Sequence, residues 1–202
     1  MVDLSTIFVI VIVVFDFVIS IWNAYSAGVT LTLLRGQPGQ TFARVAAGSG
    51  LGLAFAGMAY AMLIVFAFAA LLLGVLVAGD VAVVLAFDFL VFGAMIIGFG
   101  LVVTAQSIAI AYRQRSFGTI AISAWNVFAE VWDIAIYAEG FKAAYGSLGG
   151  GRDRVNLYAV LLLAILVAFF ITYAAYRHGV KSTERTLSGA PSSSWTPGSA
   201  SA

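Results

Sequence analysis

Five long apolar stretches, separated by short polar segments, dominate the pattern of residues along this chain. The stretches cover about 4–27, 45–76, 81–112, 117–139 and 155–176. Because a helix rises 1.5 Å per residue, about 20 apolar residues cross the hydrocarbon core of a bilayer. The pattern therefore predicts an all-α, polytopic membrane protein in which residues 1–187 form a bundle of five transmembrane helices.

The polar segments between the stretches predict turns and an orientation. Residues 35–40 supply the first turn, residues 78–80 form the break before the third stretch, and residues 188–202 have the Ser-, Gly- and Pro-rich composition of a disordered tail. Basic residues are unequally shared between the two sides: Arg35, Arg44, Arg113, Arg115, Arg177, Lys181 and Arg185 against Lys142, Arg152 and Arg154. Positive charge favours the cytoplasmic side, so we expect the N-terminus outside and the C-terminus in the cytoplasm.

The amino-acid composition agrees with a lipid bilayer as the solvent, and it excludes several kinds of functional site. Of 202 residues, 62% are hydrophobic and 9% are charged, where soluble domains carry about 25% charged residues. The net charge of +1 offers no basic stripe for nucleic acid. Without cysteine, thiolate metal sites and cysteine nucleophiles are excluded, and no motif predicts a cofactor.

The fourth stretch carries a stripe of polar residues. Its members recur at steps of three and four residues, which places them on one face of a helix. They are Thr119, Ser123, Asn126, Glu130, Asp133 and Tyr137. Ionisable groups at membrane depth cost about 2.5–3.5 kcal/mol each, so two acids one turn apart favour a functional site.

The first and third stretches contribute further polar positions. Asp16, Ser20 and Asn23 share a face of the first stretch, and Asp88 lies in the third. Under the predicted topology the first and fourth stretches run in opposite directions, with Asp16 and Glu130 both near the middle of the membrane. We therefore expect these two helices to pair across one polar seam.

The acids at membrane depth have no matching bases, because Lys and Arg lie at the ends of the stretches. If the acids converge, neighbouring carboxylates cannot all stay ionised in a low dielectric. Such a site holds protons or binds a cation; an oxygen-only site suits hard ions such as Ca²⁺, Mg²⁺, Mn²⁺ or Na⁺, without singling out a metal.

Other interpretations of the same residues stay open. Interhelical hydrogen bonds account for a polar stripe without any ion, and Asp16 alone can serve as a neutral donor. Glycines in the second and third stretches favour close helix packing.

Enzymatic chemistry is not favoured, since the apolar stretches contain no histidine and the chain has no phosphate-binding glycine loop. The sequence therefore predicts a channel or transporter for protons or small cations. Its predicted site residues are Asp16, Asn23, Asp88, Ser123, Asn126, Glu130 and Asp133. The alternative is a non-catalytic scaffold or accessory subunit of a membrane complex. Either function implies a lipid bilayer and a homo-oligomer or complex as partners.

Overall fold

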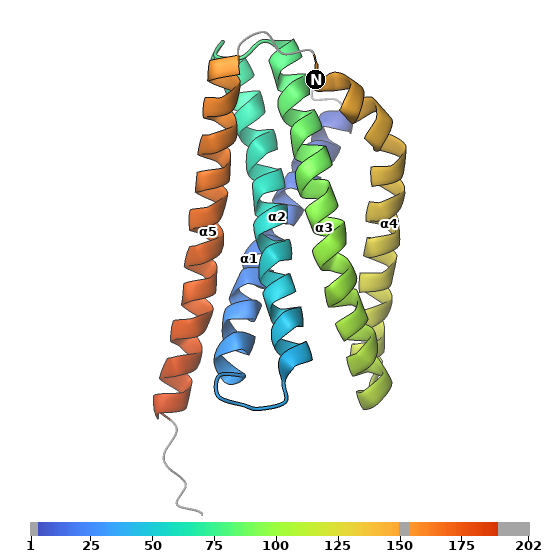
Figure 1. Ribbon diagram of the computed structural model, residues 1–202, viewed down its shortest axis with the longest axis vertical. Coiled ribbons are helices and arrows are strands. Elements are labelled where there is room, and N and C mark those ends of the chain that lie inside the picture. The colour runs from blue at the N-terminus through green and yellow to red at the C-terminus, as the bar shows by residue number, and fades with distance from the viewer. Residues whose placement is uncertain (1–3, 150–153, 190–202) are drawn as a thin grey trace, which may run out of the picture.

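Five helices form the computed structural model, which describes residues 4–149 and 154–189 (Figure 1). In chain order they are α1 Leu4–Leu33, α2 Thr41–Leu72, α3 Ala78–Gln114, α4 Phe117–Ser147 and α5 Arg154–Gly189. All five are long and apolar enough to cross a membrane. This confirms the predicted all-α, five-span membrane fold.

The helices extend beyond the apolar stretches that predicted them. With 30 to 37 residues, they measure about 45–55 Å at 1.5 Å per residue, against about 30 Å for a hydrocarbon core. Apolar runs mark the part of a helix that lies in lipid and not its ends. The predicted tail, residues 188–202, accordingly begins inside α5, and its residues 190–202 lie outside those the structure describes.

The turn between α2 and α3 lies earlier than residues 78–80, so that predicted position was wrong. Those three residues form the first turn of α3. The chain reverses at Gly74, which adopts a φ of +69°, a conformation that glycine reaches without steric penalty. Around it, the Val75 and Leu76 amides both donate to the Ala70 carbonyl, at 2.8 and 3.1 Å.

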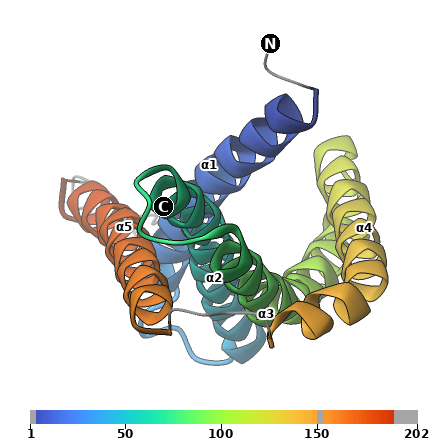
Figure 2. The ribbon, with the colours of Figure 1, turned by 90° about the horizontal axis from the view of Figure 1, so that it is seen from above.

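α2 and α3 form the centre of the bundle. α2 packs against α1, α3 and α5, whereas α4 packs on α3 alone. Viewed from above, α1 and α4 stand apart on the same side of the α2–α3 pair (Figure 2). Small side chains let α2 lie close to its neighbours; its fully buried residues include Ala54, Ala56, Ala59, Ala61 and Ala67.

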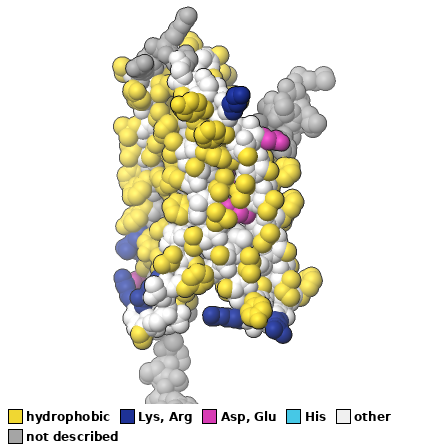
Figure 3. Space-filling view, turned by 45° about the vertical axis from the view of Figure 1, so that its right-hand side comes forward, with side chains coloured by type: hydrophobic (Ala, Val, Ile, Leu, Met, Phe, Trp, Pro, Cys, Tyr) yellow, Lys and Arg dark blue, Asp and Glu magenta, His cyan; other side chains and the backbone are white. Residues whose placement is uncertain are grey.

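One end of the bundle is rich in basic residues, and we call it the basic end. It holds the α1–α2 loop, the α3–α4 turn and the end of α5, where the seven basic residues of the larger group lie. The other end, with the α2–α3 turn, is called the opposite end. In Figure 3 hydrophobic side chains cover the height of one face, most of its Lys and Arg lie near the lower, basic end, and acidic side chains appear at mid-height.

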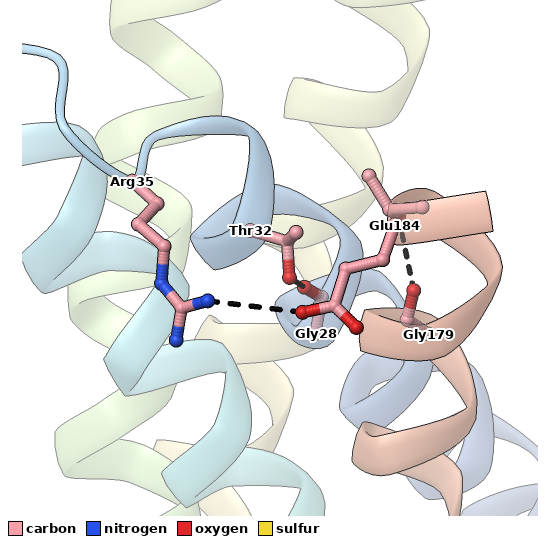
Figure 4. A network of polar contacts seen from close by, with 6 residues as sticks. Gly28, Thr32, Arg35, Gly179 and Glu184 are labelled. Carbon is pink, nitrogen blue, oxygen red and sulfur yellow. Dashed lines mark hydrogen bonds and ion pairs between the residues drawn. The ribbon is translucent and has the colours of Figure 1, made fainter. Parts of the chain in front are cut away.

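α1 and α5 cross with their backbones in close contact. At Gly28 an added Cβ would meet the backbone carbonyl of Tyr176, and at Gly179 it would meet that of Tyr25. Thr32 donates to the Gly28 carbonyl at 2.8 Å and Thr183 to the Gly179 carbonyl at 2.9 Å. Beyond the crossing, Arg35 and Glu184 form an ion pair at 3.7 Å (Figure 4). Each helix therefore places a glycine against the backbone of the other helix. In each helix the carbonyl of that glycine accepts a hydrogen bond from the threonine four residues later.

The same pattern of residues underlies both sides of this crossing. Residues 25–32 and 176–183 each read Tyr-x-x-Gly-Val-x-x-Thr. Since α1 and α5 both run from the opposite end towards the basic end (Figure 1), two equal motifs on parallel helices meet around a local two-fold axis. Comparing these two segments would have predicted the α1–α5 contact from the sequence.

Candidate ion-binding site

The polar stripe of α4 faces α3, the one helix against which α4 packs. Ser123 and Glu130 are buried, and Thr119, Asn126, Asp133 and Tyr137 are partly buried. By contrast, nearly every other residue between positions 120 and 139 is exposed. The helical face predicted from the sequence is therefore the face that α4 buries.

Large side chains on one helix fit against small residues on the other along the α3–α4 contact. The Phe89 ring lies where a Gly140 Cβ would be, the Tyr137 ring lies beside Gly93, and the Glu130 carboxyl lies against Gly100. Further along, Thr104 donates to the Asn126 carbonyl at 3.4 Å. Along these contacts the residue numbers increase on α3 while they decrease on α4 by nearly equal amounts, which shows that the two helices are antiparallel.

Four acids on three helices are linked by pairwise charge interactions, and we call them the acid cluster: Asp16, Asp88, Glu130 and Asp133. Asp16 of α1 lies close enough to Asp133 and to Asp88 for the carboxyl charges to repel one another. Glu130 and Asp133, three residues apart on α4, interact in the same way. Each of the four acids that the sequence singled out therefore interacts through its charge with at least one of the others.

Two members of the acid cluster are buried without a hydrogen-bond partner. Asp88 is 1% exposed and Glu130 is 6% exposed, and Oδ1 of Asp88 and Oε1 of Glu130 have no partner among the described residues. No ion pair joins any of the four acids to a basic side chain within residues 4–149 and 154–189. Buried polar atoms are normally paired, so these oxygens are suited to a proton or a cation.

The expected pairing of helices one and four is wrong, because α1 and α4 make no packing contact. Asp16 and Asp133 interact through their charges and not through helix packing. Asn23 lies seven residues further along α1, partly buried, and is not brought to Asn126 on α4. A similar expected depth in the membrane does not decide which helices are neighbours.

Tyr60 of α2 is a member of this region that the sequence analysis missed. It is partly buried and lies within electrostatic range of Asp88, Asp16 and Asp133. Its hydroxyl is the one polar side chain in the stretch from Leu51 to Leu72. A single polar side chain in an otherwise apolar stretch was the sequence signal that would have identified Tyr60.

Among the described residues, no group of three or more His, Asp or Glu side chains is arranged to hold a metal ion. The acids are coupled through their charges and distributed over three helices. The acid cluster therefore offers several separate carboxyl groups to a proton or cation, not one metal site.

No family model matches the chain, and no curated protein or solved structure matches it.

Proposed function

We propose that this protein moves protons or small cations across a membrane through the acid cluster on α1, α3 and α4. The observation that carries the proposal is the burial of Asp88 and Glu130, each with an unpartnered carboxyl oxygen. A carboxylate at this depth needs a proton or a counter-charge, and the described residues supply no base for it. An external ion is the remaining source.

The polar path of α4 supports movement along the bundle. From the acid cluster towards the basic end it continues through Asn126 and Ser123 to Thr119, whose hydroxyl lies 2.9 Å from that of Ser116. Oxygen atoms at successive turns of one helix face give a proton or a partly hydrated cation several weak positions. Transport needs sites of this kind, which bind strongly enough to admit an ion and weakly enough to release it.

Flux measurements in liposomes test the proposal. The purified protein is reconstituted, and proton and sodium flux are followed separately under a membrane potential. Glu130→Gln combined with Asp133→Asn should abolish flux, whereas Glu139→Gln, which removes an exposed acid from the same helix, should leave it unchanged. If the wild-type protein passes no ion under any gradient while folding normally, the proposal is wrong.

A second function, that of an accessory subunit in a membrane complex, is favoured by two partly exposed acids on helices that do not pack on each other. α1 and α4 make no packing contact, Asp16 and Asp133 are partly exposed, and a partner helix with a basic residue would neutralise them. A synthetic transmembrane helix with one central Lys should then bind the protein more tightly than the same helix with Leu. Binding is measured by energy transfer, and Asp16→Asn should remove the difference.

Orientation and assembly belong to the same proposal. We infer that the basic end faces the cytoplasm, which places the N-terminus outside. We also propose that the protein assembles as a homo-oligomer or within a membrane complex, and the mass of the detergent-solubilised particle by light scattering tests this.

A further inference from the structure

A hollow of about 280 Å³ lies between α3 and α4 near the opposite end of the bundle. We call it the α3–α4 hollow. Its walls are mostly small side chains, with Ser147 at the outer limit on α4. The small lining residues are Ala82, Ala86, Gly140, Ala143 and Ala144. The hollow is wide open to the surroundings of the protein, and its volume equals that of several water molecules at about 30 Å³ each.

On its side nearer the acid cluster, the hollow ends beside an aromatic pair. Phe89 and Gly140 are the lining residues closest to the acid positions along the two helices. Phe89 stacks on Tyr137 with ring centroids 5.3 Å apart and 15° between the planes. The Tyr137 hydroxyl donates to the Leu90 carbonyl at 3.0 Å, which fixes the ring across the contact between the helices.

The aromatic pair separates the hollow from the acids. Tyr137 is four residues beyond Asp133 on the same face of α4, a distance of about 6 Å along the helix. Glu130 follows one turn further towards the basic end. A species that enters the hollow therefore meets the Phe89–Tyr137 pair first and the acid cluster directly behind it.

We propose that the α3–α4 hollow is the access path for water, protons and small hydrated cations from the opposite end, and that the Phe89–Tyr137 pair is the barrier that closes it. This inference rests on the proposed transport function. A hydrophobic constriction is an established way to gate a pore. Phe89 and Tyr137 thus control access, and neither binds the ion.

Thiol labelling tests the path directly, because the chain contains no cysteine and each introduced thiol is unique. Single variants Ala144→Cys, in the hollow, and Ser123→Cys, buried behind the barrier, are reconstituted in liposomes. A membrane-impermeant, positively charged methanethiosulfonate reagent is added from the side of the opposite end. Val131→Cys, on the exposed side of α4, shows whether the reagent reaches thiols through the lipid.

We expect Ala144→Cys to be labelled in every background and Val131→Cys in none. Ser123→Cys should be labelled slowly with Tyr137 present and about tenfold faster with Tyr137→Ala, because the stacked rings then no longer close the path; a tenfold rate change corresponds to about 1.4 kcal/mol. Phe89→Ala, on the other helix, should have the same effect, so the test does not depend on one variant folding. Tyr137→Phe keeps the ring and should keep labelling slow.

Two results would overturn the inference: no labelling of Ala144→Cys from that side, or equal labelling of Ser123→Cys with and without the aromatic pair. Labelling needs no ion flux, so the two proposals fail separately. The expected labelling pattern without flux removes the transport function and supports the access path. Flux with Ser123→Cys unlabelled in both barrier variants supports transport and excludes this path.

Discussion

The carboxyl group of Glu130 on α4 lies directly against Gly100 on α3, in the space that a Cβ atom at position 100 would occupy. The buried acid therefore owes its position to the absence of a side chain on the neighbouring helix. The position of the Glu130 carboxyl group should therefore change when a single uncharged methyl group is added at position 100.

Gly100→Ala should displace Glu130 and reduce ion flux towards the level of Glu130→Gln. The added methyl group also overpacks the α3–α4 contact, which should lower the free energy of unfolding by about 1–3 kcal/mol. Gly98→Ala is the matched control, because nothing lies within 4 Å of a Cβ there. Flux and thermal unfolding are measured on both; equal behaviour of the two variants would show that the Glu130–Gly100 contact is unimportant.

Gly28→Ala and Gly179→Ala should each destabilise the bundle by about 1–3 kcal/mol or more, because the added Cβ meets a backbone carbonyl that no rotamer change can move. Gly48→Ala, in open space on α2, should be neutral or stabilising by up to about 1 kcal/mol, since alanine favours helix. Unfolding midpoints in detergent give the comparison. A stable Gly28→Ala protein would mean that α1 and α5 do not cross here.

Removing the Arg35–Glu184 ion pair should matter far less than adding a methyl group to the nearby crossing. Both side chains are largely exposed, at 80% and 51%, and exposed pairs contribute about 0–1 kcal/mol. Glu184→Gln should therefore shift the free energy of unfolding by less than about 1 kcal/mol, and raising the salt concentration should abolish even this shift. A larger, salt-independent loss would assign Glu184 a structural role that the ion pair does not explain.

Asp88→Leu should raise the free energy of unfolding in detergent by about 1–3 kcal/mol, because it replaces a buried carboxyl that has an unpartnered oxygen by an apolar side chain of similar shape. Glu139→Leu, at an exposed position of α4, should change stability by no more than about 0.5 kcal/mol. Chemical unfolding of the two variants gives the difference. Destabilisation by Asp88→Leu would show instead that the purified protein holds an ion at Asp88.

Cysteine labelling in whole cells checks the orientation. With the basic end in the cytoplasm, a thiol from Lys142→Cys should react with an impermeant reagent added outside intact cells. A thiol from Gln37→Cys, in the α1–α2 loop, should react only after permeabilisation. The reverse pattern would place the basic end outside and contradict the positive-inside expectation.

Sequence periodicity predicted the fold class and the inward face of α4, because both follow from where apolar residues recur along one helix. Helix neighbours do not follow from that pattern. Asp16 and Glu130 are expected at a similar depth, yet α1 packs on α2 and α5, since its glycine at position 28 fits the backbone of α5. Tyr60 was missed for a related reason: a single hydroxyl has no periodicity, and its relation to three acids exists only once the helices are packed.

The α1–α5 crossing also constrains how the protein is made. Gly28 and Gly179 are separated by 151 positions (179 minus 28), and synthesis at about 5–20 residues per second puts about 8–30 s between them. During that interval α1 is in the membrane without its partner, and its glycine face is open to other helices. The α1–α5 contact therefore forms only after the fifth of these helices has been synthesised, long after the first.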